Sequence, residues 1–169
     1  MKQRVCLLFF LLLGGYLGMV AQPAMNNDRL IDILQKEGLR YEGENGSWLI
    51  YYEDRILLIL TDESRNRMRI FTPIISEEDI GPTEMRRMLT ANFHEALDAK
   101  YSLSEGFVIS VFTHPFRELS CTQLLDAMQQ VDQLARTFGT TYTSAVPFTT
   151  PPSRSGKQPI QEPVLEKKS

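Results

Sequence analysis

The chain has 169 residues, of which 43% are apolar and 23% are charged, and its formal net charge is −3. This composition is that of a globular protein and excludes wholesale disorder. The two cysteines and two histidines are spread along the chain and do not form a Cys/His zinc framework. We expect one folded domain over residues 22–146, because about 125 residues suffice for one core and not for two.

The first residues predict an export signal. Lys2 and Arg4 precede an apolar run from Val5 to Val20, which as a helix would cover about 24 Å of a bilayer core that is about 30 Å thick. We therefore expect a signal peptide over residues 1–21 and a mature protein that is exported, either to the bacterial periplasm or out of the cell. An anchor formed by an uncleaved signal is the alternative. After cleavage we expect no stable membrane span.

Signal cleavage would remove Cys6 and leave Cys121 as the remaining cysteine, so no internal disulfide is expected. Cys121 falls at the start of an expected helix, where the helix dipole favours the thiolate. No histidine partner follows it in the sequence, and we interpret it as a plain, partly buried thiol.

The folded part begins with a helix and then changes to strands. Asn26 can cap a first helix whose apolar face is Leu30, Ile33 and Leu34, and Gly38 is a typical residue for its end. Strands are expected over 39–42, 47–53, 55–62 and 67–74, the last of them closed by Pro73. The Asn45-Gly46 pair predicts a tight hairpin between the first two strands.

A second helix is expected to begin at Pro82, since proline is favoured at the first helical position. Its apolar side chains fall on one side of the helix: Met85, Met88, Leu89, Phe93, Ala96 and Leu97. Two further strands are expected over 100–104 and 107–113, joined by a turn at Glu105-Gly106.

The third helix has the clearest start in the chain. Ser120 and Gln123 have the spacing of a capping box, and an apolar stripe follows as far as Phe138, before Gly139. Residues 147–169 are rich in proline and polar residues and predict a disordered, weakly basic tail.

The element order, α-β-β-β-β-α-β-β-α, resembles the type III secretion chaperone-like fold and, more narrowly, the YbjN-type sensory-domain proteins of bacteria. The residues that carry the resemblance are 92–98 at the end of the second helix, the strand pair 101–103 and 107–112, and the last helix from Leu124 to Phe138. The resemblance implies an α+β fold, with an antiparallel sheet and helices packed mainly on one face. It also implies dimers that bind partner polypeptides, or proteins without an assigned activity.

Residues that could carry chemistry are sparse. His94 and Asp98 lie four apart on the second helix, a spacing that allows two ligands on one metal, but both point away from the apolar stripe. His114 precedes Pro115 and indicates a surface turn. No nucleophile-elbow, phosphate-loop or dinucleotide motif occurs. We therefore expect no catalytic residues, no cofactor and no metal, and the acidic middle of the chain argues against nucleic acid as a partner.

The strands are apolar on both faces. In the segment 55–60, five successive residues are apolar, and side chains alternate between the two faces of a strand. Three helices can cover one face, so we expect the other to bind protein, first a second copy in a homodimer and next a client polypeptide. The expected interaction residues are Leu49, Tyr51, Leu57, Ile59, Phe71, Val108 and Phe112.

The sequence thus predicts an exported, non-catalytic protein-binding domain, chaperone-like or accessory. The first alternative is an envelope sensory module that binds a small ligand in a pocket with convergent polar groups. The second is an enzyme, which would need a cleft that gathers carboxylates with His94, His114 or Cys121. The alternative to a partner is that a helix or the tail of the same chain covers the second face of the sheet.

Overall fold

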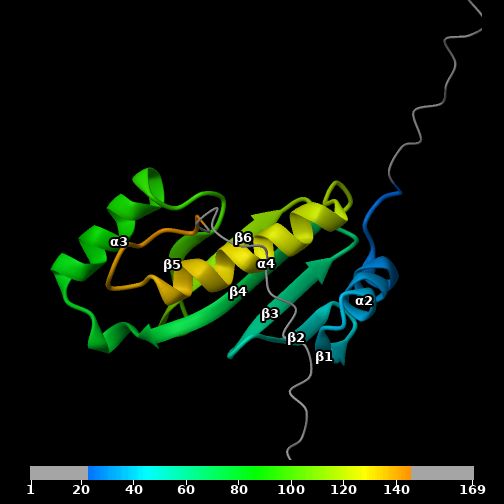
Figure 1. Cartoon of the computed structure of the whole chain (residues 1–169), viewed down its shortest axis with the longest axis horizontal. Helices are drawn as coiled ribbons and strands as arrows, with labels where there is room; N and C mark the ends of the chain where they lie inside the picture. The colour runs from blue at the N-terminus through cyan, green and yellow to red at the C-terminus, as the bar shows by residue number, and fades with distance from the viewer. Residues whose placement is uncertain (1–22, 146–169) are drawn as a thin grey trace, which may run out of the picture.

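The computed structural model describes residues 23–145, so the predicted signal peptide at 1–21 and the predicted tail at 147–169 lie outside the described residues. The described part is an α+β fold of three α-helices, one short 3-10 helix and six strands (Figure 1). In chain order the elements are α2 (Asn27–Lys36), β1 (Arg40–Glu44), β2 (Ser47–Tyr52), β3 (Arg55–Asp62), β4 (Arg67–Ser76), η1 (Glu77–Asp79), α3 (Pro82–His94), β5 (Lys100–Ser104), β6 (Phe107–His114) and α4 (Cys121–Arg136).

The six strands form one sheet in the order β1-β2-β3-β4-β6-β5, with every neighbouring pair antiparallel. The predicted Asn-Gly hairpin joins β1 and β2, and both Asn45 and Gly46 have positive φ, as a tight hairpin turn requires. The expectation that Pro73 closes the fourth strand is wrong. β4 continues to Ser76 through a register shift between Pro73 and Ile75, and such an irregularity accommodates a residue without an N–H donor.

Among residues 23–145, the helices leave one face of the sheet open. α4 crosses the other face in contact with β3, β4, β5 and β6, while α2 lies beside β1 and α3 lies beyond β5 at the opposite end (Figure 1). We call these two sides the covered face and the open face. The covered face supplies the core, which includes the buried side chains of Trp48, Ile50, Leu57, Ile59, Met68, Ile70, Val108 and Phe112.

The capping box predicted for the last helix is confirmed. The hydroxyl of Ser120 accepts a hydrogen bond from the backbone N–H of Gln123 at 3.1 Å, and the Gln123 side chain accepts one from the Ser120 N–H at 2.9 Å. The start of α2 also follows the prediction, because the Asn26 side chain accepts from the Arg29 N–H at 2.8 Å. Both helices therefore begin where their side chains satisfy free backbone donors.

The second helix does not bury the whole stripe that the sequence suggested. α3 buries Met88 and Ala91, whereas Leu89 is 59% exposed and Phe93 is 84% exposed. α3 packs against the body through a narrow side only, beside β5, and no described element covers its other side (Figure 1). Leu97, just after the helix, is also exposed. We call Leu89, Phe93 and Leu97 the α3 ridge.

None of the helices in the described residues is both long enough and apolar enough to span a bilayer.

Candidate protein-interaction surface

One row of side chains crosses the open face of the sheet from edge to edge. The row has one residue from each strand, and each residue is paired with the next one across the sheet: Glu42, Leu49, Leu58, Phe71, Val111 and Lys100. Residues that are directly paired in antiparallel strands share a face. The four central strands therefore present an apolar row, with a charged residue on each edge strand.

Other apolar side chains extend this row. On the open face, Leu49, Ile56 and Leu60 are between 38% and 44% exposed, and Leu58, Phe71 and Val111 are half-buried by their neighbours. A hollow of about 350 Å³ lies at the β5 end of the face. Its lining combines apolar residues with one cation and several hydroxyl groups, among them Leu60, Arg69, Phe71, Ile109, Val111 and Thr113.

The residues predicted for the interaction surface divide between the two faces. Leu49, Tyr51 and Phe71 lie on the open face, as the register shows. The other four were expected on the same surface, and this is wrong because all of them are buried on the covered face: Leu57, Ile59 and Val108 are 0% exposed, and Phe112 is 6% exposed.

The error comes from the register between strands. Alternation within β3 does separate Leu57 and Ile59 from Ile56, Leu58 and Leu60, as expected. However, Leu49 pairs with Leu58 and not with a residue of the buried set. A shift of one residue in the assumed pairing exchanges the two faces of a strand. The open face therefore contains Ile56, Leu58 and Leu60, which the prediction left out.

Polar contacts fix both edges of the open face. At the β1 edge, the Tyr51 hydroxyl donates to the Glu42 carboxylate at 2.7 Å, and the Arg40 guanidinium lies 3.6 Å from the centre of the Tyr51 ring. The hydrogen bond to Glu42 is the main cause of a raised Tyr51 pKa. At the β5 edge, the Lys100 ammonium donates to backbone carbonyls at the end of α3, including that of Asn92 at 2.7 Å. Lys100 therefore binds α3 and is not free for a partner.

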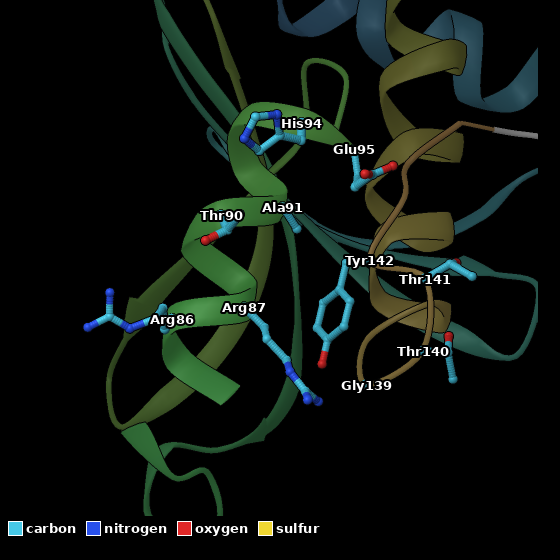
Figure 2. Close-up of a pocket in the computed structure, with 10 residues that line it drawn as sticks. All are labelled: Arg86, Arg87, Thr90, Ala91, His94, Glu95, Gly139, Thr140, Thr141 and Tyr142. Carbon is cyan, nitrogen blue, oxygen red and sulfur yellow. The ribbon is translucent and has the colours of Figure 1, made fainter. Parts of the chain in front are cut away.

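A second hollow, of about 530 Å³, separates α3 from the segment that follows α4 (Figure 2). Arg87 points toward Tyr142, whereas Arg86 and Thr90 point away from that segment (Figure 2). The Tyr142 hydroxyl already donates to Glu84, and burial, followed by this bond, raises the Tyr142 pKa. The polar groups of this hollow do not converge on one point, so it offers little support for a small-ligand site.

The residues considered for catalysis or metal binding do not come together as a site. His94 is exposed and packs edge-on against Phe93, with ring centres 4.9 Å apart. His114 lies 2.7 Å from the Pro115 carbonyl through its Nδ1 atom, and Cys121 is a half-buried free thiol at the start of α4. The backbone N–H of Asp98 donates to Gln130. Within residues 23–145, no three His, Cys, Asp or Glu side chains are grouped as a metal site would require.

The sequence matches no model of a known protein family and no curated protein. Its structure is similar to a chain of the HopA1–SchA chaperone–effector complex, with 16% identity and a TM-score of 0.50 over 63% of this chain and 87% of that one. It is also similar to a chain of the ExsC–ExsE complex, with 15% identity and a TM-score of 0.52 over 64% of this chain and 86% of that one.

A third similar structure is YbjN from E. coli, with 11% identity and a TM-score of 0.44 over 67% of this chain and 88% of that one. The first two similarities define the class of fold, which is the secretion-chaperone-like α+β fold. The predicted fold, an antiparallel sheet with helices on one face, is confirmed.

Proposed function

We propose that this chain is an exported, non-catalytic protein-binding domain that binds polypeptide on the open face of its sheet and acts as a homodimer. The apolar row across the four central strands carries the proposal. Full burial of a fully exposed large apolar side chain gains about 1.5–3 kcal/mol, and these partly exposed side chains would gain a fraction of that on binding. Contiguous apolar surface of this kind is typical of interaction sites.

The fold supports a protein as the partner. One similar structure is a chaperone–effector complex and another is the ExsC–ExsE complex. The scattered positions of His94, His114 and Cys121 give no support to a catalytic role. Export is inferred from the sequence of residues 1–21, and an anchored form with an uncleaved signal is the alternative.

The homodimer is best assigned to the α3 ridge. In a symmetric dimer the same surface of both subunits meets. A contact through the open face would bring both copies of Arg69 into the interface, and burial of an unpaired guanidinium is costly. The α3 ridge contributes Leu89, Phe93 and Leu97, which are uncharged and exposed. This leaves the open face for a client polypeptide.

The client-binding function can be tested with the exported form, residues 22–169, and reduced α-lactalbumin as an unfolded probe. We expect the protein to suppress light scattering by the aggregating probe, and Leu60→Asp to abolish most of this suppression. Leu60 is 38% exposed, so the substitution spares the core. Gln129→Glu adds the same charge on the exposed side of α4 and should have no effect. If Leu60→Asp suppressed aggregation of the probe as well as Gln129→Glu does, the open face would not be the client-binding surface.

A further inference from the structure

Two neighbouring hollows share lining residues on β4 and β6, and we call them together the trough. The first is the hollow of about 350 Å³ at the β5 end of the face. The second, of about 390 Å³, is lined by Arg67, Met68, Arg69, Thr113, His114 and Pro115. Both are lined by Arg69 and Thr113, so they adjoin each other. The trough therefore has an apolar half, floored by residues such as Phe71 and Val111, and a half that contains two arginines.

The arginines of the trough have no acidic partner in the described structure. Arg69 lies directly opposite Leu60 on one side and Thr113 on the other. Among residues 23–145, the ion pairs within 4.0 Å involve other arginines and neither Arg67 nor Arg69. An arginine beside apolar surface in an acidic protein favours an anionic group in the partner.

Asp62 is the acidic residue closest to this pair in the register, since it lies opposite Arg67. Its carboxylate is already bound within the β3–β4 turn: one oxygen accepts from the Ser64 hydroxyl at 2.6 Å, and the other accepts from the Arg65 guanidinium at 2.9 Å. Asp62 therefore lowers the positive potential at Arg67 without pairing with it. Arg69 is the stronger candidate for a contact with the partner.

We propose that the trough binds an extended client segment in which a large apolar side chain lies two residues from an Asp or Glu. The inference rests on the proposed function and adds the chemistry of the client. Arg69 and Phe71 are two apart on β4 and share the open face, so their side chains are about 7 Å apart. An extended peptide presents its residues i and i+2 on one face with the same spacing. Its carboxylate would bind Arg69 while its apolar side chain covers Phe71 and Val111.

Residues 147–169 are a less favourable occupant of this trough than an acidic segment of another protein. Residues 147–169 contain the proposed spacing once with a large side chain, at Ile160 and Glu162, but they are net basic, because Arg154, Lys157, Lys167 and Lys168 outnumber Glu162 and Glu166. The chemistry of the trough therefore favours an acidic segment of another protein.

Fluorescence polarisation with labelled peptides tests the inference on residues 22–169. The probe has three Leu-Thr-Glu-Thr repeats, which place Leu and Glu on one face of an extended chain. A matched peptide of Leu-Glu-Thr-Thr repeats has the same composition but places them on opposite faces. A third peptide replaces each Glu of the probe with Lys. We expect the probe to bind at least about fivefold more tightly than either control, and its affinity to fall as salt is added.

Arg69→Glu should weaken binding of the probe about tenfold, because a charge-assisted contact becomes a repulsion. Arg86→Glu, an exposed arginine on α3, makes the same change of charge outside the trough and should alter affinity less than twofold. Equal effects of the two variants, equal binding of the three peptides, or no binding would overturn the inference. If Leu60→Asp still abolishes suppression of α-lactalbumin aggregation, the proposed function survives that failure.

Discussion

Gln130 is a polar residue within the buried face of α4, and it connects this helix to the loop before β5. Its side-chain oxygen accepts from the backbone N–H of Asp98 at 2.9 Å and from that of Ala99 at 3.2 Å. Its amide nitrogen donates to Asp126 at 2.7 Å. The residue is 3% exposed, so water does not replace these bonds when the side chain is removed. A glutamine among the apolar residues of the helix was a sign of this role that could be recognised before the structure.

Gln130→Leu should lower the free energy of unfolding by about 2 kcal/mol, since the buried N–H of Ala99 and the partly buried N–H of Asp98 lose their acceptor. Gln129→Leu, at the adjacent exposed position, should change it by no more than about 0.5 kcal/mol. Urea denaturation followed by circular dichroism measures both. Similar values for the two variants would show that the Gln130 bonds contribute little to stability.

Asp62 makes stability depend on pH. The Ser64 hydroxyl, the backbone N–H of Arg65 and the Arg65 guanidinium all bind its carboxylate and hold its pKa well below the ordinary value. A carboxyl group with a lowered pKa in the folded state stabilises the fold above its unfolded pKa, near 3.9, and this contribution is lost as the pH falls.

Asp62→Asn should therefore lower the melting temperature at pH 7, and the difference from the parent protein should shrink as the pH falls below about 4. Thermal unfolding between pH 7 and pH 2 tests this expectation. Asp32→Asn, in α2, is the matched control and should give a small difference that does not vary in this way. If the difference in melting temperature between Asp62→Asn and the parent protein stayed constant with pH, the carboxylate would be excluded as its cause.

At the scale of elements, the local signals in the sequence were sufficient for most boundaries. β3 was expected at 55–62 and is found at Arg55–Asp62, because a run of apolar residues between turns defines a strand well. α4 begins at its capping box for the same local reason. Pro73 misled the prediction of β4, since a register irregularity, which depends on the neighbouring strand β6, lets the strand continue.

The faces of the elements were harder to predict than their bounds. In β3 both sets of alternate residues are apolar, so alternation alone cannot say which set α4 covers. In α3 the apolar residues are more numerous than the narrow contact with the body can bury, and Leu89 and Phe93 remain exposed. Which side of a helix or strand is buried depends on what packs against it, which is a property of the tertiary structure.

At the scale of the molecule, the exposed α3 ridge predicts association. Light scattering coupled to size-exclusion chromatography of residues 22–169 should give the mass of a dimer, and Phe93→Glu should give that of a monomer. Phe93 is 84% exposed, so the substitution should leave the circular dichroism spectrum unchanged. Leu60→Asp, on the open face, should remain dimeric. A monomeric parent protein, or a dimer that only Leu60→Asp disrupts, would contradict the role of α3.

The sequence alone determined the class of the fold, the order of its elements and the presence of apolar side chains on both faces of the central strands. These depend on local periodicity, caps and turns, which a short segment encodes by itself. The tertiary structure decided that Leu57 and Ile59 are buried in the core while Leu58 and Leu60 face outward, and that Arg69 lies beside Leu60 with no acidic partner among residues 23–145. Register and helix packing join residues that are distant along the chain, so no single segment contains that information.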